Sequence, residues 1–205
     1  MTISLTNTGK RFNREWIFRH IDYTFSGGMN YAITGPNGSG KSTLLQVIGG
    51  AVSASEGKVL YLEGEQEKQP ADIYRQLAIA APYLELIEEM TLLEFLRFHF
   101  QFKPLLKGLD IASVIAAVGL QAASGKQVRF FSSGMRQRVK LAQAVFADVP
   151  LLLLDEPCTN LDVEGINLYL RLVEQYCQGR LIIVSSNDET EYSFCKERID
   201  MRDFK

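Results

Sequence analysis

The sequence predicts an α/β fold: a parallel, doubly wound sheet with an inserted helical segment and a small antiparallel β-layer. A glycine-rich loop, Gly35–Thr43, follows a short apolar strand and precedes an amphipathic helix. Two later apolar runs have strand length, Leu151–Leu154 and Leu181–Val184. More than one hundred positions separate Lys41 from Asp155, whereas a crossover between parallel strands needs only about a dozen residues. The intervening segment is therefore expected to hold an inserted lobe.

Composition and charge indicate one ordinary globular domain. The chain has 205 residues, of which 46% are hydrophobic and 22% charged. A net charge of −2 gives no indication of a nucleic-acid partner. No apolar run reaches the roughly 18 residues that span a bilayer, and Met1–Leu5 does not read as a signal peptide. Three cysteines without metal-ligand spacing, Cys158, Cys177 and Cys195, predict free thiols in a reducing cytosol.

The first 82 residues read mainly as strands. Apolar and polar residues alternate up to about Thr34, which predicts a half-exposed β-layer. Its last strand, Met29–Thr34, leads directly into the glycine-rich loop. Beyond the loop helix we expect a strand at Lys58–Leu62, a polar surface loop at Gln66–Gln69 and a buried strand at Leu77–Ala81.

The period then becomes helical, from Tyr83 to about Phe102, with a capping box formed by Thr91 and Glu94. Further segments complete the pattern: a helix at Asp110–Val118, a helix from Ser132 or Ser133 to about Ala147, a helix at Val163–Tyr176 and a strand-like stretch at Arg198–Phe204. We therefore expect a single domain, with residues of about 1–82 and 147–205 forming the core and β-layer and about 83–146 forming the helical lobe.

The glycine-rich loop predicts a nucleotide site. Its residues fit G-x-x-x-x-G-K-[ST], a loop whose backbone N–H groups surround phosphates at the start of a helix. Lys41 is expected to reach the β- and γ-phosphates, and the Ser42 hydroxyl to ligate Mg²⁺. The predicted nucleotide-binding residues are Gly35, Pro36, Asn37, Gly38, Ser39, Gly40, Lys41, Ser42 and Thr43.

Two carboxylates follow the apolar strand Leu151–Leu154. Asp155 is expected to hold Mg²⁺ through water, while Glu156 faces the γ-phosphate and a water nucleophile. On its own, the pair would more simply be a strand that ends in acids at the surface. The phosphate loop elsewhere in the chain favours the catalytic interpretation.

A third motif, Phe131–Arg138, reads alone as an N-capped amphipathic helix. Together the three motifs resemble the ATP-binding cassette (ABC) family of ATPases, whose signature is L-S-G-G-Q. Nearly the whole chain follows the family order, with R-Q-R-V-K-L-A-Q-A-V at Arg136–Val145, L-L-L-L-D-E-P at Leu151–Pro157 and N-L-D at Asn160–Asp162.

The resemblance implies a RecA-like P-loop NTPase core with an antiparallel β-subdomain and an inserted α-helical subdomain. It implies ATP and Mg²⁺ as ligands, and a head-to-tail dimer in which the signature of one chain meets the nucleotide of the other. The signature residues that would act in trans are Ser132, Ser133, Gly134 and Met135. Phe12 matches the aromatic residue that stacks on adenine; the alternative is a strand residue packed inward.

The chain departs from the family pattern at three places. Tyr83 stands where the family has a Gln that contacts Mg²⁺, and a phenol is a poorer ligand than an amide. Asn187 stands where the family has a His bonded to the γ-phosphate, and Asn carries no charge. Ser133 and Met135 replace a Gly and the Gln of the signature. Because the expected general base Glu156 is present, we predict an ATPase that hydrolyses slowly.

The resemblance implies, from the family's commonest role, that this chain is the ATP-binding subunit of a transporter on the cytoplasmic face of the cell membrane. Its expected partners are a separate integral membrane permease and a second ABC subunit, as homodimer or heterodimer, with no nucleic acid. The aromatic residues Phe95, Phe98, Phe100 and Phe102 are either a seat for the permease or lobe core. A nucleotide-gated regulatory module and a soluble ABC ATPase outside transport remain alternatives. The short C-terminal end favours an exporter.

Overall fold

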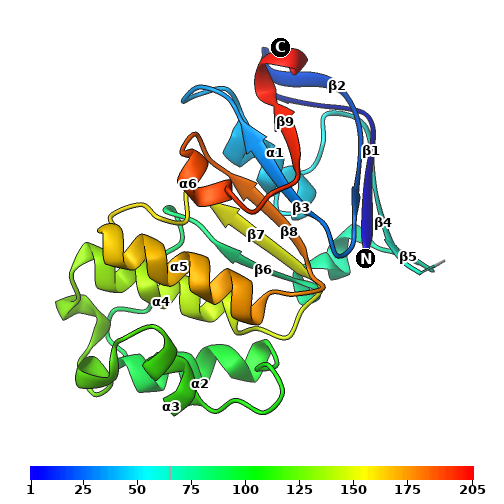
Figure 1. The fold of residues 1–205 in the computed structure, drawn as a ribbon. Coiled ribbons are helices and arrows are strands. Elements are labelled where there is room, and N and C mark those ends of the chain that lie inside the picture. The colour runs from blue at the N-terminus through cyan, green and yellow to red at the C-terminus, as the bar shows by residue number, and fades with distance from the viewer. Residues whose placement is uncertain (65) are drawn as a thin grey trace.

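The computed structural model describes residues 1–64 and 66–205, and its centre is a five-stranded sheet (Figure 1). All neighbouring strands in this sheet are parallel. Its spatial order is β6 (Leu77–Ala80), β7 (Leu151–Asp155), β8 (Leu181–Ser185), β3 (Asn30–Thr34) and β9 (Glu197–Asp200). The predicted α/β fold is confirmed, and the glycine-rich loop and the acidic pair both lie at the carboxyl end of this sheet, where ligands bind in such folds.

The second sheet is the expected antiparallel β-layer. Its order is β2 (Glu15–Ser26), β1 (Thr2–Phe12), β4 (Glu56–Glu63) and β5 (Gln66–Lys68). The predicted surface loop at Gln66–Gln69 is wrong over its first three residues, which pair with β4. Polar edge strands carry no alternation of apolar residues, so the pattern alone gave no signal for β5.

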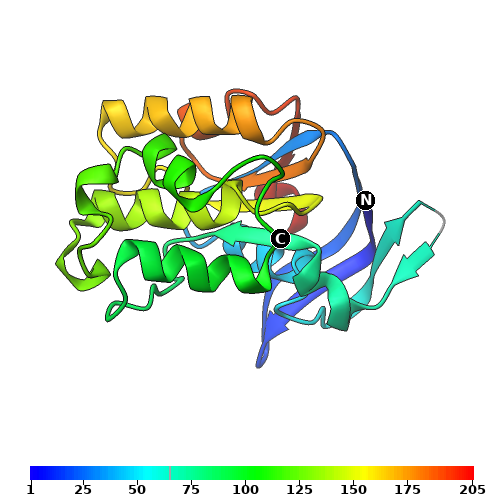
Figure 2. The ribbon, with the colours of Figure 1, turned by 90° about the horizontal axis from the view of Figure 1, so that it is seen from below.

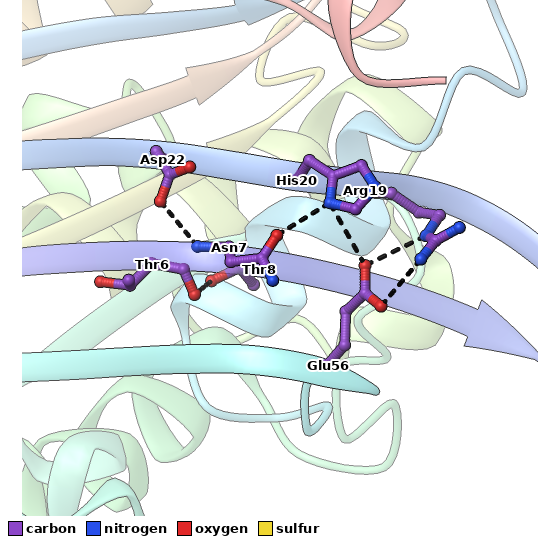
Figure 3. Close-up of polar contacts among 7 residues, drawn as sticks. All are labelled: Thr6, Asn7, Thr8, Arg19, His20, Asp22 and Glu56. Carbon is purple, nitrogen blue, oxygen red and sulfur yellow. Dashed lines mark hydrogen bonds and ion pairs between the residues drawn. The ribbon is translucent and has the colours of Figure 1, made fainter.

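Backbone irregularities bend the β-layer, and Figure 3 shows the polar cluster that accompanies them. Asn7 and His20 have positive φ values of 44° and 56°, and His20 Nδ1 lies 2.8 Å from Asn7 Oδ1. Arg19 Nε donates to Glu56 Oε1 at 3.1 Å. Beside them Gly57 has φ 73°, and a Cβ there would overlap the backbone of Asn7. Only glycine fits at this crossing of strands.

Two cores lie on opposite faces of the parallel sheet. The first contains Leu151 and Leu153 together with α1 (Lys41–Ile48) and the β-layer. The second contains Leu152 and Leu154 together with the helices on the other face. Figure 2 shows those helices on the side of the sheet away from the β-layer. A strand buried on both faces must be apolar at every position, which explains the continuous run that marks β7.

The helices largely follow their sequence signals. They are α2 (Leu92–Phe102), α3 (Ile111–Ala117), α4 (Ser133–Val145), α5 (Val163–Tyr176) and α6 (Glu189–Tyr192), with short 3₁₀ helices at Pro70–Arg75, Gln121–Ala123, Val128–Phe130 and Met201–Phe204. The capping box of Thr91 and Glu94 is confirmed. Among the described residues, no helix combines the length and the apolar character needed to cross a membrane.

Two element bounds differ from the prediction. The helical period was expected from Tyr83, yet residues 83–91 precede α2, which begins at Leu92 as the predicted Thr91 cap requires. The stretch Arg198–Phe204 is a strand only as far as Asp200. The Asp200 carboxylate then accepts a hydrogen bond from Arg202 N at 3.0 Å and starts a 3₁₀ turn.

The three cysteines are free thiols, as predicted. Cys158 and Cys177 are buried, and Cys195 is partly buried. Burial raises the pKa of Cys177 to about 11 and that of Cys195 to about 12. It raises the pKa of Cys158 further still. All three are therefore protonated at neutral pH.

Candidate nucleotide-binding site

The glycine-rich loop joins β3 to α1 and turns tightly. Ser39 N donates to Pro36 O at 3.0 Å, which closes the turn before the helix. Gly40 has φ 103°, and a Cβ at this position would lie 2.6 Å from Ile17 Cγ2 of β2. The loop thus packs so closely against the β-layer that no larger residue fits at Gly40.

Lys41 lies over this loop instead of pointing into solvent. Its side chain is 5% exposed, and Nζ donates to Gly35 O at 2.8 Å and to Pro36 O at 3.3 Å. The Ser39 hydroxyl is buried and has no hydrogen-bond partner among the described residues. Helix α1 begins here with no acidic residue in its first turn. An ammonium group, a free hydroxyl and unpaired helix N–H groups are donors that fit a chain of phosphates.

The acidic pair lies at the end of β7, beside β8. Asp155 is 1% exposed, and its Oδ1 accepts a hydrogen bond from Ser185 Oγ at 2.6 Å. Glu156 N donates to Ser185 O at 2.9 Å, and Glu156 itself has φ 43°. Ser185 was not among the predicted site residues; the only sequence signal was a polar residue at the end of an apolar strand. It fixes the position of both acids.

A cavity of about 260 Å³ lies between the loop and the acidic pair. It brings Glu156 together with Lys41 and Ser42. Its lining residues are Ile17, Asn37, Gly38, Gly40, Lys41, Ser42, Thr43 and Glu156. The predicted phosphate ligands and the predicted general base therefore share one space.

Asn187 and Tyr83 lie at the margin of this site. Asn187 is exposed, and its Nδ2 donates to Asn37 Oδ1 in the loop at 3.0 Å. Tyr83 is 46% exposed. Burial raises the pKa of the Tyr83 hydroxyl; a polar contact with Gln46 of α1 opposes this shift, and the charge of Asp155 adds to it. Both non-consensus residues thus reach the neighbourhood of the site.

Phe12 lies near the end of β1 and is 48% exposed. The alternative of an inward-packed strand residue is therefore wrong. Lys10 Nζ lies 4.9 Å from the centre of its ring. Phe12 is not among the residues that line the 260 Å³ cavity; Ile17, from the paired strand β2, reaches that cavity instead. A role for Phe12 in stacking on adenine stays a prediction.

The signature residues lie in a different place. Ser132 caps α4, its Oγ accepting from Met135 N at 3.2 Å. With Ser133 and Gly134, these residues line a separate cavity of about 490 Å³, which also includes Asn160–Asp162. Within one chain, the signature and the phosphate loop do not line a common cavity.

Two buried side chains outside the predicted set contact the turn that follows Glu156. They are Gln137 of α4 and Glu191 of α6. Gln137 lies in the R-Q-R stretch of a predicted helix, whereas no sequence pattern marked Glu191 as a buried residue. The described residues contain no group of three or more His, Cys, Asp or Glu side chains arranged to hold a metal ion.

Comparison with known proteins gives a consistent result. A family model described as "ABC transporter" matches residues 18–159. An uncharacterised ABC transporter ATP-binding protein, YybJ of Bacillus subtilis, is 30% identical over 97% of this chain and 92% of its own length. The cytochrome c biogenesis ATP-binding export protein CcmA of Xanthomonas campestris is 33% identical over 82% of this chain and 77% of its own length.

Solved structures agree on the fold. A putative ABC transporter ATP-binding protein of Pyrococcus furiosus superimposes with a TM-score of 0.84 at 18% identity, covering 100% of this chain and 99% of that one. A bacterial ABC transporter cassette whose structure is dimeric gives a TM-score of 0.78 at 22% identity, covering 97% of this chain and 94% of that one.

Proposed function

The chain belongs to the ABC transporter family as an ATP-binding subunit, and from this we propose that it hydrolyses MgATP slowly to drive a separate membrane permease. Residues of about 1–82 and 147–205 form the catalytic core and β-layer in this proposal, and about 83–146 form the lobe that meets the permease. The name of the relative CcmA supports export as the direction of transport.

The observation that carries the proposal is the shared cavity of Lys41, Ser42 and Glu156. Lys41 and the loop N–H groups bind and orient the phosphates. Glu156 holds the attacking water and accepts its proton. The positive φ of Glu156 turns its backbone sharply at the end of β7, next to the cavity.

Magnesium fits the donors that remain. Ser42 supplies a hydroxyl oxygen and Asp155 a carboxylate, both of which are oxygen ligands of the kind Mg²⁺ prefers. The ion would neutralise charge that develops on the phosphate oxygens. Tyr83 is the third residue we assign to this region, as a poor substitute for an amide ligand.

A second ABC subunit completes each site. The phosphate loop and the signature residues line different cavities of one chain, which supports a head-to-tail pair with Ser132–Met135 acting on the partner's nucleotide. The partner is a second copy or a related subunit with a closer match to the family signature. In either case, ATP bound between the subunits would hold them together.

The proposal is tested by ATP hydrolysis and ATP binding of the purified full chain. Glu156→Gln is expected to lower kcat by about 100-fold or more, because the amide accepts no proton. Lys41→Ala is expected to weaken ATP binding about tenfold or more in calorimetry, because a charged hydrogen bond is lost. Glu174→Gln, an exposed acid on α5, is the matched control and should change neither.

One alternative function has support from a specific observation. Asn187 replaces the usual His and is bonded to Asn37, so the chain could bind ATP as a regulatory module without useful hydrolysis. Equal rates for wild type and Glu156→Gln, with ATP affinity retained, would favour the regulatory module. ATP affinity that is the same in Lys41→Ala as in wild type would contradict both functions.

A further inference from the structure

The turn that follows Glu156 is held from two sides by buried side chains. Gln137 Nε2, from α4, donates to Pro157 O at 2.7 Å. Cys158 N donates to Glu191 Oε1, from α6, at 2.7 Å. The two consecutive residues after Glu156 are thus anchored to two elements that are distant in the sequence.

Both anchoring side chains are deeply buried. Gln137 is 3% exposed and Glu191 is 5% exposed. A buried polar group destabilises the fold unless it is hydrogen-bonded, so each contact is strongly favoured over its absence. Tyr169, which is fully buried, donates its hydroxyl to Glu191 O at 2.8 Å and fixes the backbone of α6 as well.

Burying the carboxyl group of Glu191 in this position is energetically unfavourable. Its Oε2 is buried with no hydrogen-bond partner among the described residues. Burial raises the pKa of the carboxyl, a polar contact with the Ser186 side chain and the hydrogen bond from Cys158 N–H oppose that shift, and the charges of Asp188 and Glu156 add to it. Glu191 contacts Cys158, which lies two residues after the expected general base Glu156. A buried carboxyl in this position points to a role beyond packing.

The contacts also connect the parts of the site. Gln137 lies on the helix that begins with the signature residues. Glu191 lies on α6, just after Asn187, which is bonded to Asn37 of the phosphate loop. Neither Gln137 nor Glu191 is among the residues that line the 260 Å³ cavity. The most direct connection from either side chain to this cavity is the backbone that carries Glu156.

We propose that Gln137 and Glu191 are positioning residues that hold the Glu156 carboxylate at the phosphate cavity by fixing the Pro157–Cys158 peptide. This inference rests on the proposed hydrolysis of ATP. A displacement of about 1 Å at a reacting group lowers a rate by up to about 100-fold. Loss of either contact should thus affect the chemical step and leave ATP binding in place.

The test compares variants of the full chain by kcat, KM and ATP affinity. Gln137→Leu and Glu191→Leu are each expected to lower kcat by about 10- to 100-fold with KM and affinity changed by less than about twofold. Glu191→Gln keeps an oxygen acceptor for Cys158 N and should retain kcat to within about threefold. Because both residues act on one turn, the double Leu variant should lose much less than the product of the single losses.

A control is Gln127→Leu, which removes a bond of the same kind but at an exposed position, from Gln127 Nε2 to Glu89 O at 2.8 Å, away from the turn. It should leave kcat unchanged. A second readout is amide hydrogen exchange at Cys158, which should be faster in Glu191→Leu than in wild type. Should Glu191→Leu fail to fold in circular dichroism, Glu191→Asp, one methylene shorter, takes its place in both measurements.

The outcomes separate the two proposals. Wild-type rates in both Leu variants, or a loss of kcat in Glu191→Gln as large as in Glu191→Leu, would overturn the positioning role while leaving ATP hydrolysis intact. A wild type that stays inactive at micromolar protein, where copies of the chain can pair, would overturn the proposed hydrolysis by this chain, and the inference with it.

Discussion

Asn187 is the side chain whose identity bears most directly on the rate of hydrolysis. It lies at the rim of the phosphate loop, held by its 3.0 Å bond to Asn37. An amide donates hydrogen bonds but neither carries charge nor exchanges a proton near neutral pH. A histidine in this position would supply both properties.

We therefore expect Asn187→His to raise kcat for ATP hydrolysis about tenfold, through better stabilisation of charge that develops on the phosphate. The rate should be measured at saturating MgATP. Asn187→Ala is the control, and it should produce no gain. A similar gain from both substitutions would mean that release from Asn37, and not the imidazole, limits the wild type.

At the scale of elements, the helical lobe depends on a partly buried contact between α2 and α4. His99 Nε2 donates to Gln143 O at 3.0 Å. Burial lowers the pKa of His99 below its ordinary value of 6.5, the bond to Gln143 opposes the shift, and the charge of Lys103 adds to it. His99 is therefore neutral in the folded chain at a pH where the unfolded chain begins to take up a proton.

The lowered pKa of His99 should make the folded chain less stable at acidic pH. Above pH 6.5 His99 is neutral in both states, and it contributes no pH dependence. As the pH falls below 6.5 towards the lower folded pKa, the unfolded state binds more protons, so stability is lost by at most about 1.4 kcal/mol per pH unit. Urea unfolding between pH 7 and 5.5 should show a smaller loss in His99→Gln than in wild type.

At the scale of the whole molecule, one chain keeps its phosphate loop and its signature residues in separate cavities. If each site needs both, an isolated chain binds ATP without turning it over. The hydrolysis rate per chain should therefore rise with protein concentration until pairing is complete, whereas the number of ATP molecules bound per chain at saturating ATP should stay the same. A rate per chain that stays constant from nanomolar to micromolar protein would contradict pairing of identical chains.

Much of this arrangement could be predicted from local sequence. The glycine-rich loop, the apolar run of β7 and the Thr91–Glu94 capping box each specify structure through neighbours along the chain, and each was confirmed. The polar strand β5 was missed because its residues resemble those of a loop. Residues 83–91, which were expected to share the helical period, instead lead into α2 ahead of its Thr91 cap.

Contacts between distant segments could not be predicted in the same way. Ser185 beside Asp155, and Glu191 beside Cys158, meet only because the strands and helices pack in a particular order. A single Glu on a short helix has no pattern that marks it as buried. Phe12 shows the same limit, since alternation in a strand does not say which face is covered.

The protonated, enclosed thiols of Cys158, Cys177 and Cys195 have a practical consequence for following motion in this protein. Maleimide dyes react with thiolate at accessible positions, so the native chain should remain nearly unlabelled at pH 7. One cysteine added at an exposed site outside the proposed nucleotide and signature residues, such as Glu174 on α5, could then carry a fluorophore without removal of the natural three. Energy transfer between two such subunits would report their approach in real time.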